Sequence, residues 1–74
     1  MNSSQLVKMV NDISNFFVSE EDKNEAINGV AGHITRFWDP RMRKEIIEYM
    51  INDGGEGLSV LSREAILTLD KPQV

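Results

Sequence analysis

A boundary between two helices is marked by the stretch Phe37-Trp38-Asp39-Pro40-Arg41-Met42-Arg43-Lys44. Proline disfavours a helical conformation in the residue before it, so a helix that arrives here must end at about residue 38. Proline is also well suited to the first position of a helix, and aspartate is a preferred N-cap. The sequence therefore predicts that one helix ends near Trp38 and that the next begins at Pro40.

Helical periodicity extends from this boundary in both directions. Apolar residues recur at spacings of three and four, which is typical of helices that bury one face. The predicted helices span about residues 4–18, 23–38, 40–52 and 59–69, followed by a frayed tail at 70–74. No segment alternates with period two over a useful length. The predicted fold class is therefore all-α, a small single-domain bundle of three to four helices.

The ends and faces of these helices give more detailed expectations. Ser3 or Ser4 is the expected cap of the first helix, and Ser59 that of the fourth. Aromatic residues fall on the predicted apolar faces of the first two helices: Phe16, Phe17, Phe37 and Trp38. Gly29 and Gly32 lie on the other side of the second helix, where each costs about 1 kcal/mol relative to alanine. They either permit close approach of a partner or are simply tolerated.

The size of the chain points to association with another chain. Its 74 residues form one domain, and a domain this small buries only roughly 60% of the surface of its unfolded chain. Cysteine is absent and His33 is the single histidine, so disulfides and the common zinc sites are excluded as staples. Association with another chain is the remaining way to stabilise so small a domain, and a homo-oligomer of the isolated protein is one form of such association.

Two features indicate a soluble, cytoplasmic protein. The N-terminal residues lack the basic start and apolar run of a signal peptide. No apolar stretch approaches the roughly 20 residues that cross a bilayer. A chain without cysteines also suits a reducing compartment. We therefore expect no contact with a membrane.

Charge is distributed unevenly along the chain. The net charge is −4, yet residues 36–44 carry +3 because four basic residues face one acidic residue, and the remainder carries −7. An acidic chain is a poor general binder of nucleic acid, which relies on neutralising phosphates. One basic segment on an acidic body favours a localised contact instead.

The basic segment occupies an unfavourable place in its own helix. Arg41, Arg43 and Lys44 stand at the start of the third helix, where the macrodipole disfavours cations by roughly 0.3–1 kcal/mol each when exposed. Local rules that fail in this way tend to mark functional sites. In one interpretation, the side chain of Arg43 extends to water and Arg41 and Lys44 are solvated. In the other, the three cations bind an anion on a partner. Trp38 is then either a buried anchor of that interface or a core residue of this chain. The predicted partner-binding residues are His33, Arg36, Trp38, Asp39, Arg41, Arg43 and Lys44.

Catalytic chemistry has little support in the sequence. His33 is better explained as a structural or interface residue than as a base, and no nucleophile motif surrounds any serine. The glycines of residues 54–57 lack the Lys-Ser/Thr pair of a phosphate-binding loop. The acidic run of residues 20–22 is typical of a solvated helix start. We expect no catalytic, cofactor-binding or metal-binding residue in this chain.

Three segments resemble a known protein family. They are Ile13-x-x-Phe16-Phe17, then Val30-Ala31-Gly32-His33-Ile34-x-Arg36-Phe37-Trp38-Asp39-Pro40-Arg41-Met42-Arg43, and Gly54-Gly55-Glu56-Gly57-Leu58. Together they resemble the delta subunit of NAD-dependent formate dehydrogenase, over about residues 6–67. The family often has Asp-Pro where this chain has Ser59-Val60, a change that keeps a possible cap.

The resemblance implies an accessory subunit of a cytoplasmic enzyme complex. Such a complex interconverts formate and carbon dioxide with NAD⁺ and NADH. Its large catalytic subunit carries a molybdenum or tungsten bis-pterin cofactor and iron–sulfur clusters, and other subunits carry FMN and receive NAD. The delta subunit is implied to hold no cofactor and to support assembly, cofactor insertion or stability. A chain without cysteines also lacks the usual ligands of iron–sulfur clusters.

Three functions remain open at this point. In the first, the chain docks on the large catalytic subunit of formate dehydrogenase through the segment from Trp38 to Arg43. In the second, the same arginines bind the anionic pterin cofactor directly during its insertion. In the third, the helix that begins at Pro40 belongs to a small helix-turn-helix protein that binds DNA.

Overall fold

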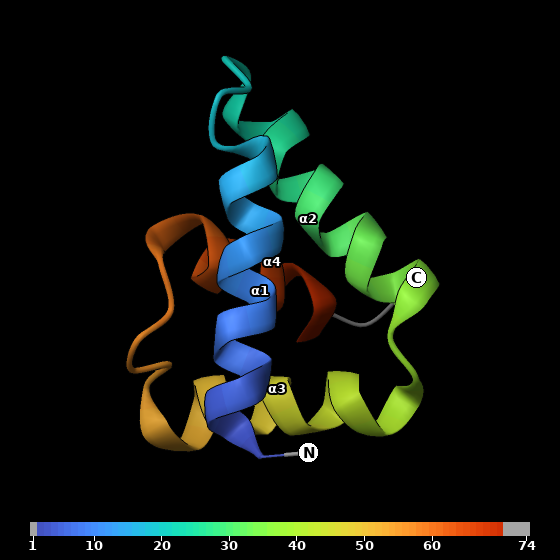
Figure 1. Ribbon diagram of the computed structural model, residues 1–74, viewed down its shortest axis with the longest axis vertical. Coiled ribbons are helices and arrows are strands. Elements are labelled where there is room, and N and C mark those ends of the chain that lie inside the picture. The colour runs from blue at the N-terminus through green and yellow to red at the C-terminus, as the bar shows by residue number, and fades with distance from the viewer. Residues whose placement is uncertain (1, 71–74) are drawn as a thin grey trace.

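The computed structural model describes residues 2–70, which form four α-helices joined by short turns (Figure 1). The helices are α1 (Ser3–Phe17), α2 (Lys23–Phe37), α3 (Pro40–Asp53) and α4 (Val60–Asp70). The predicted all-α bundle is confirmed. Asp70 was expected in a frayed tail and is instead helical, since Leu69 in the same turn packs against the core. Residues 71–74, the rest of that predicted tail, lie outside the described residues.

Side chains that cap the helix ends explain where the helices begin. Asp39 accepts hydrogen bonds from the N–H groups of Arg41 and Met42, at 2.9 and 3.1 Å, and Pro40 occupies the first helical position of α3. Ser59 caps α4 as predicted, because its hydroxyl accepts the N–H of Ser62.

The cap of α1 differs from the prediction. Asn2 accepts the N–H of Gln5 at 2.9 Å, whereas Ser3 and Ser4 already belong to the helix. The cap therefore lies one residue before the earlier of the two predicted positions.

The core lies where α1, α2 and α4 come together and α3 crosses their lower end (Figure 1). The helix α1 runs antiparallel to α2, and α3 lies across the foot of α1. Side chains from all four helices fill the space between them. The buried core residues are Leu6, Val10, Val30, Ala31, Ile34, Trp38, Ile46, Leu58, Ala65 and Ile66.

A polar network that is buried at Ser14 and Ser62 joins α1 to the start of α4. The hydroxyl of Ser62 donates to Asn11 Oδ1 at 2.8 Å and accepts from Ser59 at 2.9 Å. Because its single hydrogen is used, the 2.7 Å contact with Ser14 makes Ser14 the donor. Asn11 also accepts the N–H of Ser59 and donates to the carbonyl of Gly57. Every member of this serine–asparagine network therefore has a partner.

Candidate docking surface

The turn between α2 and α3 gathers exposed basic side chains at one corner of the molecule. Arg36 stands in the last turn of α2, and Arg41 and Lys44 stand in the first turns of α3. Asp39 sets the direction of α3 through its two cap hydrogen bonds and leaves its exposed carboxylate at the surface. We call Arg36, Asp39, Arg41 and Lys44 the α2–α3 corner.

The basic residues of this corner have no acidic partner among residues 2–70. The ion pairs in that part of the chain are Lys8–Asp12 at 2.9 Å and Lys23–Glu64 at 3.3 Å, and both lie elsewhere. The three cations therefore keep their charge available to another molecule. With Asp39 included, the corner carries a net charge of +2 (three cations and one carboxylate). Such an excess attracts an oppositely charged surface over about a Debye length, roughly 8–10 Å.

Arg43 has a role that neither sequence interpretation included. Its Nη1 donates to the main-chain carbonyls of Trp38 and Thr35, both at the C-terminal end of α2. The last carbonyls of a helix lack partners within the helix and carry its negative dipole end. Arg43 therefore satisfies the end of α2 through Nη1, so this part of its guanidinium does not extend freely to water.

Trp38 belongs to the core of this chain. Its side chain is 5% exposed and packs with the other buried residues, while its extended backbone ends α2. Of the two interpretations left open by the sequence, the structure supports the core residue. Trp38 thus positions the corner, and it is not part of the exposed surface.

An aromatic ridge runs beside the corner along α1 and α2. The ring of His33 contacts Phe37 in a tilted arrangement, with centroids 4.7 Å apart, and Phe16 meets Phe17 edge to face at 5.2 Å. A shallow cavity of about 300 Å³ lies between the two pairs and is lined by Phe16, Phe17, His33 and Ile13. We call Phe16, Phe17, His33 and Phe37 the aromatic ridge.

The exposure of this ridge was not predicted from the sequence. Phe16 is 78% exposed and Phe37 is 71% exposed, although both were assigned to buried helix faces. Consecutive residues of a helix point about 100° apart, so Phe16 cannot face the core as fully as its neighbour Phe17. The pair Phe37–Trp38 divides in the same way, with Trp38 inside. Two aromatic residues in succession, as in Phe16–Phe17 and Phe37–Trp38, indicate that one member of each pair is exposed to solvent.

Side chains that could bind a metal ion are not brought together in the described part of the chain. Among residues 2–70, no three His, Asp or Glu side chains form a group that suits a metal ion. His33 lies on the aromatic ridge, whereas the buried hydroxyls lie in the serine–asparagine network between α1 and α4. No helix within these residues is both long enough and apolar enough to cross a membrane.

The geometry offers little to the DNA-binding alternative. The helix α3 carries three basic residues, and Glu45, Glu48 and Asp53 balance their charge. Protein–DNA affinity rests on the neutralisation of phosphates by an excess of positive charge. A helix without net charge is poorly suited to that role.

Comparison with known families identifies the chain. Residues 5–66 match the family described as the NADH-dependent formate dehydrogenase delta subunit, FdsD. The chain belongs to this family. The family assignment made from the sequence segments is thereby confirmed. The range that matches the delta-subunit family contains the whole α2–α3 corner and the whole aromatic ridge. No curated protein and no solved structure shows a significant match.

Proposed function

We propose that this chain is a non-catalytic accessory subunit of formate dehydrogenase that docks on the large catalytic subunit. The docking surface is the α2–α3 corner together with the adjoining aromatic ridge. The observation that carries the proposal is the pairing of two phenylalanines, each more than 70% exposed, with basic residues that have no acidic partner among residues 2–70. The role of this accessory subunit is to support the assembly, cofactor insertion or stability of the larger subunit.

The two parts of this surface contribute differently to binding. Burying an exposed phenylalanine side chain gains roughly 1.5–3 kcal/mol, and aromatic residues are enriched among interface hot spots. Exposed charges contribute mainly to orientation and to the rate of association. The partner surface that fits is therefore an apolar patch bordered by aspartate or glutamate.

Three residues that the sequence assigned to partner binding hold the docking surface in shape. Asp39 caps α3, Arg43 satisfies the end of α2, and Trp38 fills the core. The redox centres of the enzyme belong, in this proposal, to the other subunits. We place the complex in the cytoplasm, a reducing compartment in which a chain without cysteines loses no disulfide.

Direct binding of the anionic pterin cofactor receives less support from the site. Among residues 2–70, the groove that Arg41 lines contains no second cation beside it, so a phosphate there would meet one guanidinium and not a cluster of them. Arg43, which the alternative also requires, donates to main-chain carbonyls. A protein surface with its own apolar patch matches the corner and ridge better than a phosphate does.

Co-purification from lysate of the same source tests the proposal. The tagged wild-type protein is expected to recover the large formate dehydrogenase subunit at moderate salt and less of it at high salt. The variant Arg36→Gln/Arg41→Gln is expected to recover less than the wild type does. The control Lys8→Gln removes a positive charge from an exposed position on α1 outside this surface and is expected to behave as the wild type.

Two results would contradict the proposal. Undiminished recovery with Arg36→Gln/Arg41→Gln would show that the docking surface is misplaced. Failure of the wild type to recover any formate dehydrogenase subunit would contradict the accessory role itself.

A further inference from the structure

A second surface feature lies at the opposite end of α2 from the α2–α3 corner. Here the end of α1, the turn into α2 and the start of α4 enclose a groove of about 360 Å³. Pockets that hold small ligands or side chains measure roughly 300–1,000 Å³. We call this feature the α1–α4 groove.

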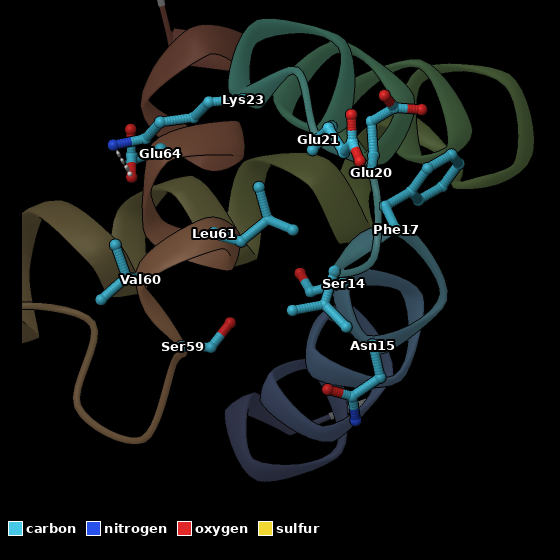
Figure 2. Close-up of a pocket in the computed structure, with 12 residues that line it drawn as sticks. Ser14, Asn15, Phe17, Glu20, Glu21, Lys23, Ser59, Val60, Leu61 and Glu64 are labelled. Carbon is cyan, nitrogen blue, oxygen red and sulfur yellow. Dashed lines mark ion pairs between the residues drawn. The ribbon is translucent and has the colours of Figure 1, made fainter.

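The interior of the α1–α4 groove is mainly apolar. Phe17 of α1 and Leu61 of α4 both line it and are half-buried; in Figure 2 the ring of Phe17 is turned away from Leu61. Ala26 is buried at its base, and the hydroxyl of Ser14 is already engaged with Ser62. The groove therefore offers apolar surface and few free polar groups, which suits a hydrocarbon or aromatic side chain.

The lips of the groove are apolar as well as exposed. Val18 is 69% exposed and Val60 is 72% exposed, although most large apolar side chains of this small protein are at least half-buried. Both residues line the groove. Two exposed valines beside an apolar groove enlarge the surface that an entering side chain would cover.

The rim of the groove is acidic. Glu20, Glu21 and Glu64 line it together with a single cation, Lys23, which pairs with Glu64 at 3.3 Å (Figure 2). The two remaining carboxylates are exposed and have no ion-pair partner within residues 2–70. A net negative rim favours lysine or arginine on the incoming molecule.

We propose that the α1–α4 groove receives an apolar side chain from a cationic segment of a partner protein, one in which lysine or arginine flanks that side chain. The inference rests on the proposed function, since the partner is another chain of the same formate dehydrogenase. The α2–α3 corner favours acidic residues on the partner, whereas the rim of the α1–α4 groove favours basic ones. The aromatic ridge lies between them, and its Phe17 also lines the groove. Opposite preferences at the two ends of α2 fix the orientation in which the chain docks.

Binding to formate dehydrogenase prepared without this chain tests the inference. The variant Val60→Asp places a charge at the apolar lip and is expected to raise the dissociation constant at least tenfold. The variant Glu20→Gln/Glu21→Gln keeps the side-chain shape, removes the attraction for cations, and is expected to weaken binding about threefold or more at low salt. The controls are Ile51→Asp, at an exposed apolar residue of α3, and Glu48→Gln, each expected to bind as the wild type does.

The outcomes separate this inference from the proposed function. If Arg36→Gln/Arg41→Gln weakens binding while Val60→Asp does not, the groove inference is wrong and the docking surface stands. If Glu20→Gln/Glu21→Gln strengthens binding, the groove faces an acidic segment and the inference is overturned. If the wild type does not bind at all, the proposed function fails and the groove inference fails with it.

Discussion

The guanidinium group of Arg43, near the start of α3, donates a hydrogen bond to the main-chain carbonyl of Trp38, the residue that ends α2. A cation that is poorly placed for its own helix is thus well placed for the preceding one. The contact also joins the two helices on either side of the α2–α3 corner. It leaves Arg36, Arg41 and Lys44 as the exposed cations of that corner.

Replacing Arg43 with methionine should therefore reduce stability. Arg43→Met keeps much of the apolar stem but removes two hydrogen bonds from a charged donor, one of them partly buried. We expect the free energy of unfolding to fall by about 1–3 kcal/mol. Chemical denaturation followed by circular dichroism measures this loss. The control Lys44→Met, at an exposed neighbour, should stay within about 0.5 kcal/mol of the wild type, and equal stability of both variants would contradict the assigned role of Arg43.

The two interior glycines of α2 should respond in opposite directions to alanine. A Cβ atom at Gly29 would lie 2.5 Å from the ring of Phe17, whereas a Cβ at Gly32 would have nothing within 4 Å. Gly32→Ala should raise the free energy of unfolding by about 0.5–1 kcal/mol, because alanine is the better helix former. Gly29→Ala should lower it, because the ring of Phe17 must move. Thermal denaturation of both variants provides the comparison, and a Gly29→Ala protein as stable as Gly32→Ala would refute the close approach.

The serine–asparagine network should be sensitive to loss of its central member. Ser62 is fully buried and contacts Asn11, Ser14 and Ser59. Ser62→Ala leaves these groups without their shared partner and should cost about 1–3 kcal/mol of unfolding free energy. Ser14→Ala removes one contact and should cost less. A double-mutant cycle by urea denaturation measures the coupling, and strictly additive effects would show that Ser14 and Ser62 do not interact.

The exposed phenylalanines should matter for docking and not for folding. Phenylalanine and serine have similar helix propensities, so Phe16→Ser and Phe37→Ser should change the unfolding free energy by no more than about 0.5 kcal/mol. The affinity for formate dehydrogenase should fall about tenfold or more for each variant, which corresponds to about 1.4 kcal/mol. Isothermal titration calorimetry and denaturation measure the two effects separately.

Trp38 provides the opposite pattern. Trp38→Phe removes volume from the core and should lower stability by at least about 1 kcal/mol. Its folded fraction should dock with nearly normal affinity. If Trp38→Phe lowered the affinity for formate dehydrogenase without lowering the free energy of unfolding, Trp38 would be an interface residue and not a core residue.

The sequence predicted the helices well because their signals are local. Asp39 and Pro40 fix the start of α3 by capping and by the geometry of proline, and both act within a few residues of the chain. The helix faces were also recognisable from their periodicity. Family resemblance added the association with formate dehydrogenase, which the residue patterns alone did not contain.

Contacts between distant residues were the part that the sequence did not predict. The bonds from Arg43 depend on how α3 folds back against the end of α2. The serine–asparagine network joins α1 to residues 46 or more positions further along the chain. The exposure of Phe16 and Phe37 depends on which edge of each apolar face meets a neighbouring helix. Periodicity identifies an apolar face, but it does not set the limit of its buried part.

The most direct measurement of the central claim is site-specific photo-crosslinking in the assembled enzyme. A photoreactive phenylalanine analogue replaces Phe37 in one preparation and Glu48, an exposed residue of α3, in a control. The docking proposal predicts that the probe at position 37 crosslinks to an acidic segment of the large catalytic subunit, with little crosslinking from position 48. A probe at position 37 that assembles with the enzyme but crosslinks to no other subunit would contradict the claim that this surface forms the interface.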